Sequence, residues 1–238
     1  MREKCTAIVL AAGAGKRMQS NVAKQYLMLG EKPVLWYALH TFEESSRIED
    51  IILVVSKGEI SYCQSEIVEK YGFKKVCAII EGGAERYLSV WNALSLLKDQ
   101  GQQYVFIHDG ARPFVNEKMI EEAYEQVVLH GACVVGMPVK DTIKIADSLD
   151  FAVNTPERKS LWAVQTPQVF RFDLVWEAYT RLMERLKETD LSVTDDAMVV
   201  ETMLKKTVKL VPGDYENIKI TTPEDMVIAE ALLQAKKS

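Results

Sequence analysis

The chain has 238 residues, 48% of them hydrophobic, and a formal net charge of −5 at pH 7. This length can bury a sizeable core without disulfide staples, and the negative charge argues against broad binding of nucleic acid or anionic membrane. Any anionic ligand must therefore be held by a local group of basic side chains.

The four cysteines include no C-x-x-C pair, and no histidine lies near enough to make a zinc motif. Reduced thiols in a cytoplasmic protein are therefore expected. The first apolar run is too short to cross a membrane, and no other segment approaches membrane-spanning length.

Short apolar runs alternate with amphipathic segments of helical period up to Met137. The predicted strands are Ala7–Leu10, Ile51–Val55, Val76–Ile80, Tyr104–Ile107 and Ala132–Met137. The predicted helices between them are Val34–Phe42, Ile60–Tyr71, Ala84–Leu97 and Lys118–Leu129. Such alternation predicts an α/β fold with a mostly parallel sheet covered by helices on both faces. Ligands of these sheets bind beyond the carboxyl ends of the strands.

The pattern changes at Pro138. Residues 138–170 read as short β segments with turn residues and many polar side chains, without the apolar content of another buried βα unit. We expect a hairpin-like excursion, a protruding β-arm at about 138–160, whose exposed edges need a partner.

Helical patterns return at 174–186 and 195–204, and a strand follows at 208–211. Asp195 and Asp196 are predicted to cap the second of these helices, with metal binding as a distant alternative. The last helix should begin at a capping box, in which Thr222 is the cap, Pro223 takes the first position and Asp225 is the capping acid. The predicted organisation is one domain, residues 1–238, that includes the arm.

The first predicted strand runs into a glycine-rich turn, "AIVLAAGAGKRM". Gly13 and Gly15 are followed by Met18 where a dinucleotide-binding fingerprint needs a third glycine, and the sequence of a P-loop is absent. The turn still offers backbone N–H groups and two positions without side chains, and Arg17 and Lys24 add positive charge. This pattern favours a phosphate site, although an ordinary surface turn remains an alternative.

The strand predicted at 104–107 leads into "HDGARP". Asp109 is placed there to hold Mg²⁺, another hard divalent cation or a ribose hydroxyl, with a turn aspartate as the alternative. We expect His108 to be a structural hydrogen-bonding residue and not a general base.

After the third predicted strand, Gly82 opens a tight turn, and Arg86 and Ser89 lie in the first turns of the next helix. That helix N-terminus can receive an anion or a base edge, with ordinary capping as an equal alternative.

Basic residues displayed on loops, Arg158 among them, are individually expected to be solvated charges. Lys219 is different, because alternation over residues 217–221 should turn Ile218 and Ile220 to one side and Lys219 to the other.

Eight ordered segments carry a family resemblance: "LAAGAGKRM", "AKQYLMLG", "GGAERYLSV", "HDGARPF", "VKDTIKI", "LWAVQTPQVF", "TDDA" and "NIKITTPEDM". Over essentially its whole length the chain resembles the 2-C-methyl-D-erythritol 4-phosphate cytidylyltransferases of non-mevalonate isoprenoid synthesis. The resemblance implies a Rossmann-like nucleotidyltransferase fold that uses Mg²⁺. It implies that the phosphate of methylerythritol phosphate attacks the α-phosphorus of CTP and that pyrophosphate leaves. It also implies a homodimer in which a β-arm reaches the neighbouring active site.

By motif position, the resemblance assigns roles to individual residues. Arg17 and Lys24 would stabilise charge on the transferring phosphate, while Arg158, acting in the neighbouring subunit, and Lys219 would position the acceptor phosphate. The CTP and metal pocket would include Ala12, Ala14, Gly15, Gly82, Arg86, Ser89 and Asp109. Thr142 in the arm and Thr166 would contact the sugar phosphate.

This assignment agrees with the chemistry that the residues offer. A phosphate monoester is largely a dianion at neutral pH, so it needs cations that hold it near a second anion and not a base. One position departs from the family: Ala23 stands where a proline usually precedes Lys24, which leaves that lysine less preorganised.

Three other functions remain open from the sequence. Ribitol-5-phosphate cytidylyltransferases share the fold and the nucleotide, but Ala12, "HDGARP" and "LWAVQTPQ" favour methylerythritol phosphate. A nicotinamide-dependent oxidoreductase lacks support because the third glycine is missing. A catalytically silent nucleotide-binding module is disfavoured by the presence of both Arg17 and Lys24.

Overall fold

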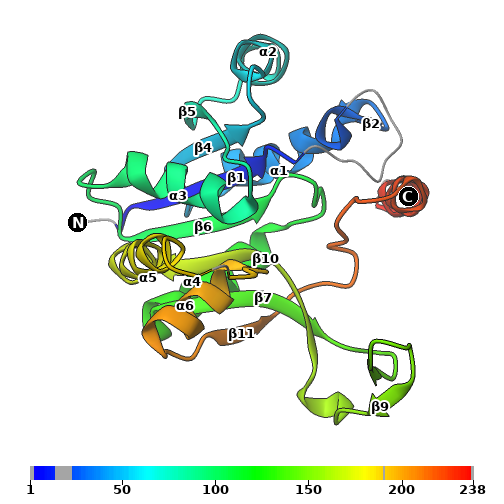
Figure 1. Ribbon diagram of the computed structural model, residues 1–238. Helices are drawn as coiled ribbons and strands as arrows, with labels where there is room; N and C mark the ends of the chain where they lie inside the picture. Colours follow the sequence, from blue (N-terminus) through cyan, green and yellow to red (C-terminus); the bar gives the residue numbers. More distant parts are fainter. Residues whose placement is uncertain (1–2, 14–22, 190, 237–238) are drawn as a thin grey trace.

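The computed structural model describes residues 3–13, 23–189 and 191–236. Within these residues the main sheet has seven strands in the order β11-β7-β10-β6-β1-β4-β5 (Figure 1). Their bounds are Cys5–Ala11 (β1), Asp50–Val55 (β4), Val76–Glu81 (β5), Tyr104–Asp109 (β6), Ala132–Pro138 (β7), Trp162–Arg171 (β10) and Lys209–Pro212 (β11). Neighbouring strands are parallel except at β10, which runs antiparallel to both β6 and β7. The prediction of a mostly parallel sheet is confirmed.

Helices cover both faces of this sheet, as predicted. They are Val34–Glu44 (α1), Ile60–Cys63 (α2), Arg86–Leu97 (α3), Glu117–His130 (α4), Phe172–Arg185 (α5), Asp196–Leu204 (α6) and Pro223–Ala235 (α7), and α2 continues as the π-helix Gln64–Glu69 (η3). One face packs against α1, η3 and α4, and the other against α3, α5 and α6 (Figure 1). On β1, Ala7 and Val9 join the first core and Ile8 joins the second. Both faces of the strand are buried, which explains its continuous apolar sequence.

The strand β10 contradicts the expectation that residues 138–170 hold no further buried strand. Residues 165–170 are buried, and β10 lies between β6 and β7 in the interior of the sheet. Its buried side chains include Gln165, Thr166 and Gln168, and each of them is hydrogen-bonded within the protein. Because these bonds offset the cost of burying polar groups, a search for apolar residues missed the strand.

Between β7 and β10 the chain leaves the main sheet. It forms a separate two-stranded sheet of β8 (Ile145–Ala146) and β9 (Ala152–Asn154), followed by a short 3-10 helix, η4 (Arg158–Ser160). We call residues 138–160 the arm, and Figure 1 shows it projecting away from the sheet. Every residue at 140–155 and 157–160 is exposed.

The predicted helix starts of the C-terminal region are confirmed. Asp195 caps α6 by accepting a hydrogen bond from the N–H of Met198 at 2.9 Å. Thr222 and Asp225 form a capping box at α7, with Pro223 in the first turn.

Across residues 3–13, 23–189 and 191–236, no helix is both long enough and apolar enough to span a membrane.

Candidate functional site

Two adjacent cavities open at the carboxyl ends of the central strands. The smaller one, of about 270 Å³, lies beyond β1 and β6 beside the start of α3, and Lys24 contributes to its lining. The larger one, of about 670 Å³, lies between β10, the start of α6 and the segment before α7, and Thr166 lines it. Arg86, Asp109 and Lys219 line both cavities, and we call these three residues the shared wall.

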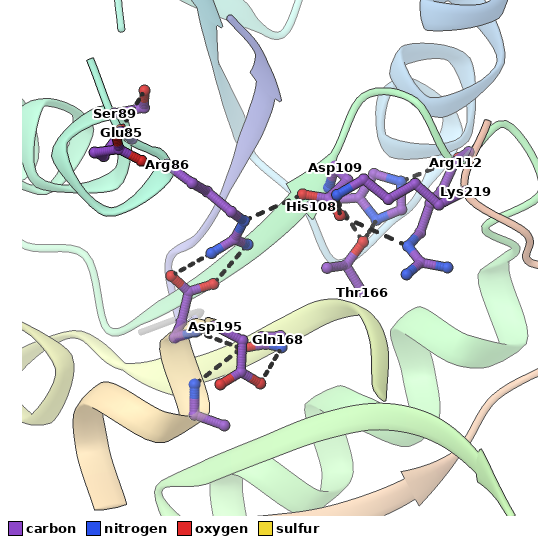
Figure 2. A network of polar contacts seen from close by, with 12 residues as sticks. Glu85, Arg86, Ser89, His108, Asp109, Arg112, Thr166, Gln168, Asp195 and Lys219 are labelled. Atoms are coloured by element: carbon purple, nitrogen blue, oxygen red, sulfur yellow. Dashed lines mark hydrogen bonds and ion pairs between the residues drawn. The ribbon is translucent and has the colours of Figure 1, made fainter. Parts of the chain in front are cut away.

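Asp109 is the centre of the shared wall (Figure 2). Its Oδ2 lies 2.8 Å from Lys219 Nζ and 3.7 Å from Arg112 Nε, and its Oδ1 lies 3.3 Å from Arg86 Nε. Burial acts to raise the pKa of Asp109, but the charges of Arg86, Lys219 and Arg112 outweigh it and hold that pKa well below its usual range. Asp109 therefore stays an ionised carboxylate beside the basic side chains of Arg86, Lys219 and Arg112.

The segment that carries Lys219 is tied down on both sides of this residue. The side-chain amide of Asn217 donates to a backbone carbonyl of β10 at 2.9 Å, and the N–H of Ile220 donates to the loop after β6 at 2.9 Å. Ile220 is buried in a small core, and Ile218 packs against the same core. The opposite side chain, Lys219, reaches Asp109, so the predicted alternation of these residues is confirmed.

His108 supports the wall from behind. The hydroxyl of Thr166 accepts a hydrogen bond from the N–H of Asp109 at 3.1 Å and lies 3.0 Å from His108 Nδ1, while Nε2 lies 3.2 Å from the carbonyl of Arg112. A carbonyl can only accept, so the proton is assigned to Nε2, and Nδ1 accepts from Thr166. Burial lowers the pKa of His108 to about 4. The ring is fully buried and both of its nitrogens are hydrogen-bonded within the protein, so His108 is a structural histidine, as predicted.

Close packing at Gly82 sets the start of α3. A side chain there would place its Cβ 2.5 Å from the Cβ of Ala12 and 2.7 Å from Ser89 Oγ. The Ser89 hydroxyl accepts from the N–H of Gly83 at 3.1 Å and donates to the carbonyl of Glu85 at 3.3 Å. Ser89, predicted to contact substrate, thus borders the smaller cavity and also holds the turn that shapes it.

Lys24 begins the short helix η2 (Lys24–Tyr26), which is fastened to the end of β1. The buried side chain of Gln25 donates to the carbonyl of Ala11 at 2.6 Å, and the hydroxyl of Tyr26 donates to Glu59 at 2.8 Å. These bonds hold Lys24 beside the smaller cavity. Three further predicted residues of this turn, Ala14, Gly15 and Arg17, lie outside the described residues.

The arm residues lie apart from the two cavities. Neither Thr142 nor Arg158 contributes to their lining. Arg158 instead donates from Nη1 to the carbonyl of Lys140 within the arm, at 3.0 Å. Within one chain, therefore, the structure does not bring these two predicted residues to the shared wall.

Arg112 contributes to the site although the sequence analysis did not single it out, and Asp196, predicted only at the start of a helix, contributes as the partner of Arg86. Arg112 lines the larger cavity, and its buried Nε has no hydrogen-bond acceptor among the described residues. Its position three residues after Asp109 could have marked it. Asp196 binds Arg86 through two hydrogen bonds of 2.9 and 2.8 Å, a pairing that no local sequence signal indicates.

The donor set at the wall fits a divalent cation that arrives with a nucleotide. Among the described residues, no three His, Cys, Asp or Glu side chains gather as a metal site. Asp109 is an ionised carboxylate that lines both cavities. Since Mg²⁺ is commonly bound by one or two carboxylates together with substrate phosphates and water, a single aspartate suffices as the protein's share.

Comparisons with known proteins give one consistent result. The family model described as 2-C-methyl-D-erythritol 4-phosphate cytidylyltransferase matches residues 5–235. A protein of that name from Lachnospira eligens is 53% identical over 96% of this chain and 99% of its own length. Another, from Lachnoclostridium phytofermentans, is 49% identical over 98% of this chain and 97% of its own length.

Solved structures agree with these sequence relatives. The 4-diphosphocytidyl-2C-methyl-D-erythritol synthase of Anaerococcus prevotii is similar to this chain with a TM-score of 0.83 and 33% identity, covering 98% of this chain and 100% of its own. The 2-C-methyl-D-erythritol 4-phosphate cytidylyltransferase of Thermus thermophilus has a TM-score of 0.76 and 29% identity, covering 95% of this chain and 98% of its own.

Proposed function

The chain belongs to the family of 2-C-methyl-D-erythritol 4-phosphate cytidylyltransferases, and we propose that it transfers CMP from CTP to 2-C-methyl-D-erythritol 4-phosphate. The products are 4-diphosphocytidyl-2-C-methyl-D-erythritol and pyrophosphate, in non-mevalonate isoprenoid biosynthesis. The observation that carries this function is the family match over residues 5–235. The two cavities joined by a charged wall give the reaction a physical setting.

Each substrate has a cavity suited to it. CTP occupies the smaller cavity, where the end of β1, Lys24 and the start of α3 meet. The sugar-alcohol phosphate occupies the larger cavity, beside Thr166 and Arg112. Lys219 lines both cavities, so its ammonium group can attract the acceptor phosphate and the nucleotide together.

The transfer step needs no protein base. An oxygen of the acceptor phosphate, largely ionised above its second pKa of about 6, forms a bond to the α-phosphorus of CTP. The bond from that phosphorus to the bridging oxygen breaks, and its electron pair leaves with pyrophosphate. Lys24 and Lys219, together with Arg17, offset the repulsion between the two anions and stabilise the charge that develops.

Asp109 is the residue that would hold Mg²⁺ or another hard divalent cation. When bound, the ion would neutralise charge on the triphosphate. The neighbouring cations keep Asp109 ionised, which supports this assignment.

A homodimer completes the site in this proposal. Thr142 and Arg158 of one chain act at the acceptor phosphate in the other chain, because neither residue lines either of the two cavities in the described part of its own chain. The exposed apolar side chains of the arm support an interface there. A cytoplasmic location is proposed as well, supported by four cysteines that form no disulfide.

A direct assay tests the function. The purified chain is given CTP, Mg²⁺ and either methylerythritol phosphate or ribitol 5-phosphate, and pyrophosphate release and product mass are measured. We expect faster turnover with methylerythritol phosphate. Faster turnover with ribitol 5-phosphate would overturn the choice of acceptor, and no pyrophosphate with either acceptor would indicate a silent nucleotide-binding module.

A further inference from the structure

The guanidinium group of Arg86 is divided between two carboxylates. Its terminal nitrogens Nη1 and Nη2 bind the two oxygens of Asp196 at 2.9 and 2.8 Å, while Nε faces Asp109 Oδ1 at a longer 3.3 Å. The fork of the arginine thus belongs to Asp196, and Asp109 receives only the remaining N–H. Figure 2 shows Arg86 reaching across from α3 toward Asp109.

Asp196 is fixed more firmly than its partners. It is 0% exposed, and Tyr179 on α5 donates its hydroxyl to Oδ1 at 2.5 Å. Gln168 on β10 accepts hydrogen bonds from the backbone N–H groups of Asp196 and Ala197, each at 2.9 Å. The backbone of Asp196 is therefore anchored to the sheet and its carboxylate to α5, which makes it a rigid acceptor for an arginine fork.

Without this acceptor, the Arg86 fork would have another carboxylate close at hand. A guanidinium prefers to bind a carboxylate through two parallel N–H···O bonds, and the nearest alternative is Asp109. A two-bond pairing there would occupy both oxygens of Asp109, including the Oδ2 that Lys219 binds at 2.8 Å. Lys219 would then have to compete with this fork for Oδ2, the atom whose contact holds it at the wall.

We propose that Asp196 is a positioning residue for the transfer reaction: it retains the fork of Arg86, so that Asp109 keeps an oxygen for Lys219. The proposal deepens the proposed function, on which it rests. Asp196 touches no substrate and acts through Arg86, Asp109 and Lys219 in that order. Its absence from the lining of both cavities agrees with an indirect effect.

The test is a double-mutant cycle of Asp196→Asn with Arg86→Gln, with kcat and both KM values measured. Asp196→Asn alone should lower kcat/KM for the acceptor on the order of 10- to 100-fold, the scale of misplacing a reacting group. The KM for CTP should change by less than about threefold, because the β1 side of the smaller cavity is untouched. In the Arg86→Gln background, Asp196→Asn should change kcat/KM for the acceptor by less than about twofold. No guanidinium fork then remains to compete with Lys219 for Asp109.

Two further variants separate positioning from stability. Val200→Ala removes buried side-chain volume from the same helix, α6, and should lower the Tm while kcat at 25 °C stays unchanged. Tyr179→Phe removes one hydrogen bond to Asp196 and should lower kcat/KM by less than Asp196→Asn does. In the Arg86→Gln background, Tyr179→Phe should have no further effect. This milder variant keeps the cycle available where Asp196→Asn does not fold.

Two results would overturn the proposal: equal losses from Asp196→Asn with and without Arg86, or a fall in Tm with unchanged kinetics. Failure of the proposed function would look different, because the unsubstituted chain would then release no pyrophosphate. In that case the cycle is run on the dissociation constant for methylerythritol phosphate, measured by calorimetry, because Lys219 is proposed to attract that phosphate. Non-additive effects there support the coupling of Asp196 to the wall, and additive effects contradict it.

Discussion

The shared wall and the arm are built on opposite principles. At the wall, the charged side chains Arg86 and Asp109 lie close together and are largely enclosed, and they are paired with partners on α6 and in the segment before α7. In the arm, apolar side chains face outward: Leu149 is 74% exposed and Phe151 is 69% exposed. At the wall, buried charges are paired with partners from the same chain. In the arm, the same chain leaves apolar side chains uncovered.

This difference separates what one chain can do alone from what requires two. Buried charges are stable only when their partners are in place, so the wall must be complete within the folded chain. Exposed apolar surface on a thin two-stranded sheet gains stability when a second molecule covers it. We therefore expect substitutions at the wall to change the activity or stability of each chain by itself. Substitutions in the arm should change the association of two chains.

The largest effect is expected at the smaller cavity. Lys24→Ala should reduce kcat on the order of 100- to 1000-fold, because the lysine stabilises charge that develops during transfer. The dissociation constant for CTP, measured by calorimetry, should change far less. Lys118→Ala, at an exposed lysine on α4, is the control and should leave both values unchanged. Equal losses in kcat and CTP affinity would show that Lys24 only binds the ground state.

The second effect is the pH dependence of stability that comes from the buried residue His108, which lies beside the shared wall. His108 has a folded-state pKa of about 4 against an ordinary value of 6.5, so between these values the unfolded chain binds the extra proton. The free energy of unfolding should therefore fall as pH drops from 6.5 to 4, by about 3 kcal/mol in total from this group.

Denaturant unfolding in magnesium-free buffer at several pH values measures this loss. His108→Gln has no titrating group in the range, so its unfolding free energy should depend less steeply on pH than that of the unsubstituted chain. The same slope in both proteins would mean that burial of His108 does not control acid stability.

The third prediction tests whether Arg158 in the arm of one chain acts in the site of another chain. Lys24→Ala and Arg158→Ala chains, each inactive alone, are mixed and allowed to exchange subunits. Random pairing should restore about a quarter of the unsubstituted activity, because half of the dimers then contain one intact site. No recovery, once exchange is proven with differently tagged chains, would place Arg158 in the site of its own chain.

A weaker effect should follow from making the arm polar. Leu149→Ser with Phe151→Ser should shift the proposed dimer toward monomer at low concentration, because apolar surface no longer drives the contact. Sedimentation velocity measures the shift. Leu129→Ser removes a side chain that is equally exposed, at 72%, but lies on α4, and should not change the oligomeric state. An unchanged dimer in the arm variant would contradict the proposed interface.

The smallest effect concerns Ala23, where the family resemblance leads us to expect a proline. The φ of Ala23 is −61°, within the range that a proline ring imposes. Ala23→Pro should raise the free energy of unfolding by about 0.5 kcal/mol by restricting the unfolded chain, and should increase kcat slightly by fixing the approach to Lys24. Ala23→Gly should shift stability in the opposite direction. A stability loss with proline would show that the backbone at this position is not compatible with the ring.

Much of the sheet could be predicted because its strands have a strong apolar pattern. The runs around Ile8 and Ile52 are apolar on both faces, as buried parallel strands must be, and amphipathic helices separate them. Helix starts such as Thr222 were equally readable, because a capping box is a contact between near neighbours in the chain.

The site was predictable in part for the same reason. Asp109 and Lys219 were expected at the ends of recognisable segments, and the structure brings them to 2.8 Å. Ser89 and Thr166 were found near their expected places, but their hydroxyls also hold the turn and the strand that frame the cavities. The binding and catalytic roles predicted for these residues, and for Arg17, Thr142 and Arg158, stay predictions.

By itself, the sequence determined the α/β architecture, the strand ends where the candidate site lies and the charged residues that we propose act there. Only the tertiary structure decided that β10 enters the interior of the sheet and that Asp196 binds the fork of Arg86, 110 positions away in the chain. The physical reason is that apolar burial leaves a periodic trace in the sequence. Burial of polar groups depends on hydrogen-bond partners that only folding brings together.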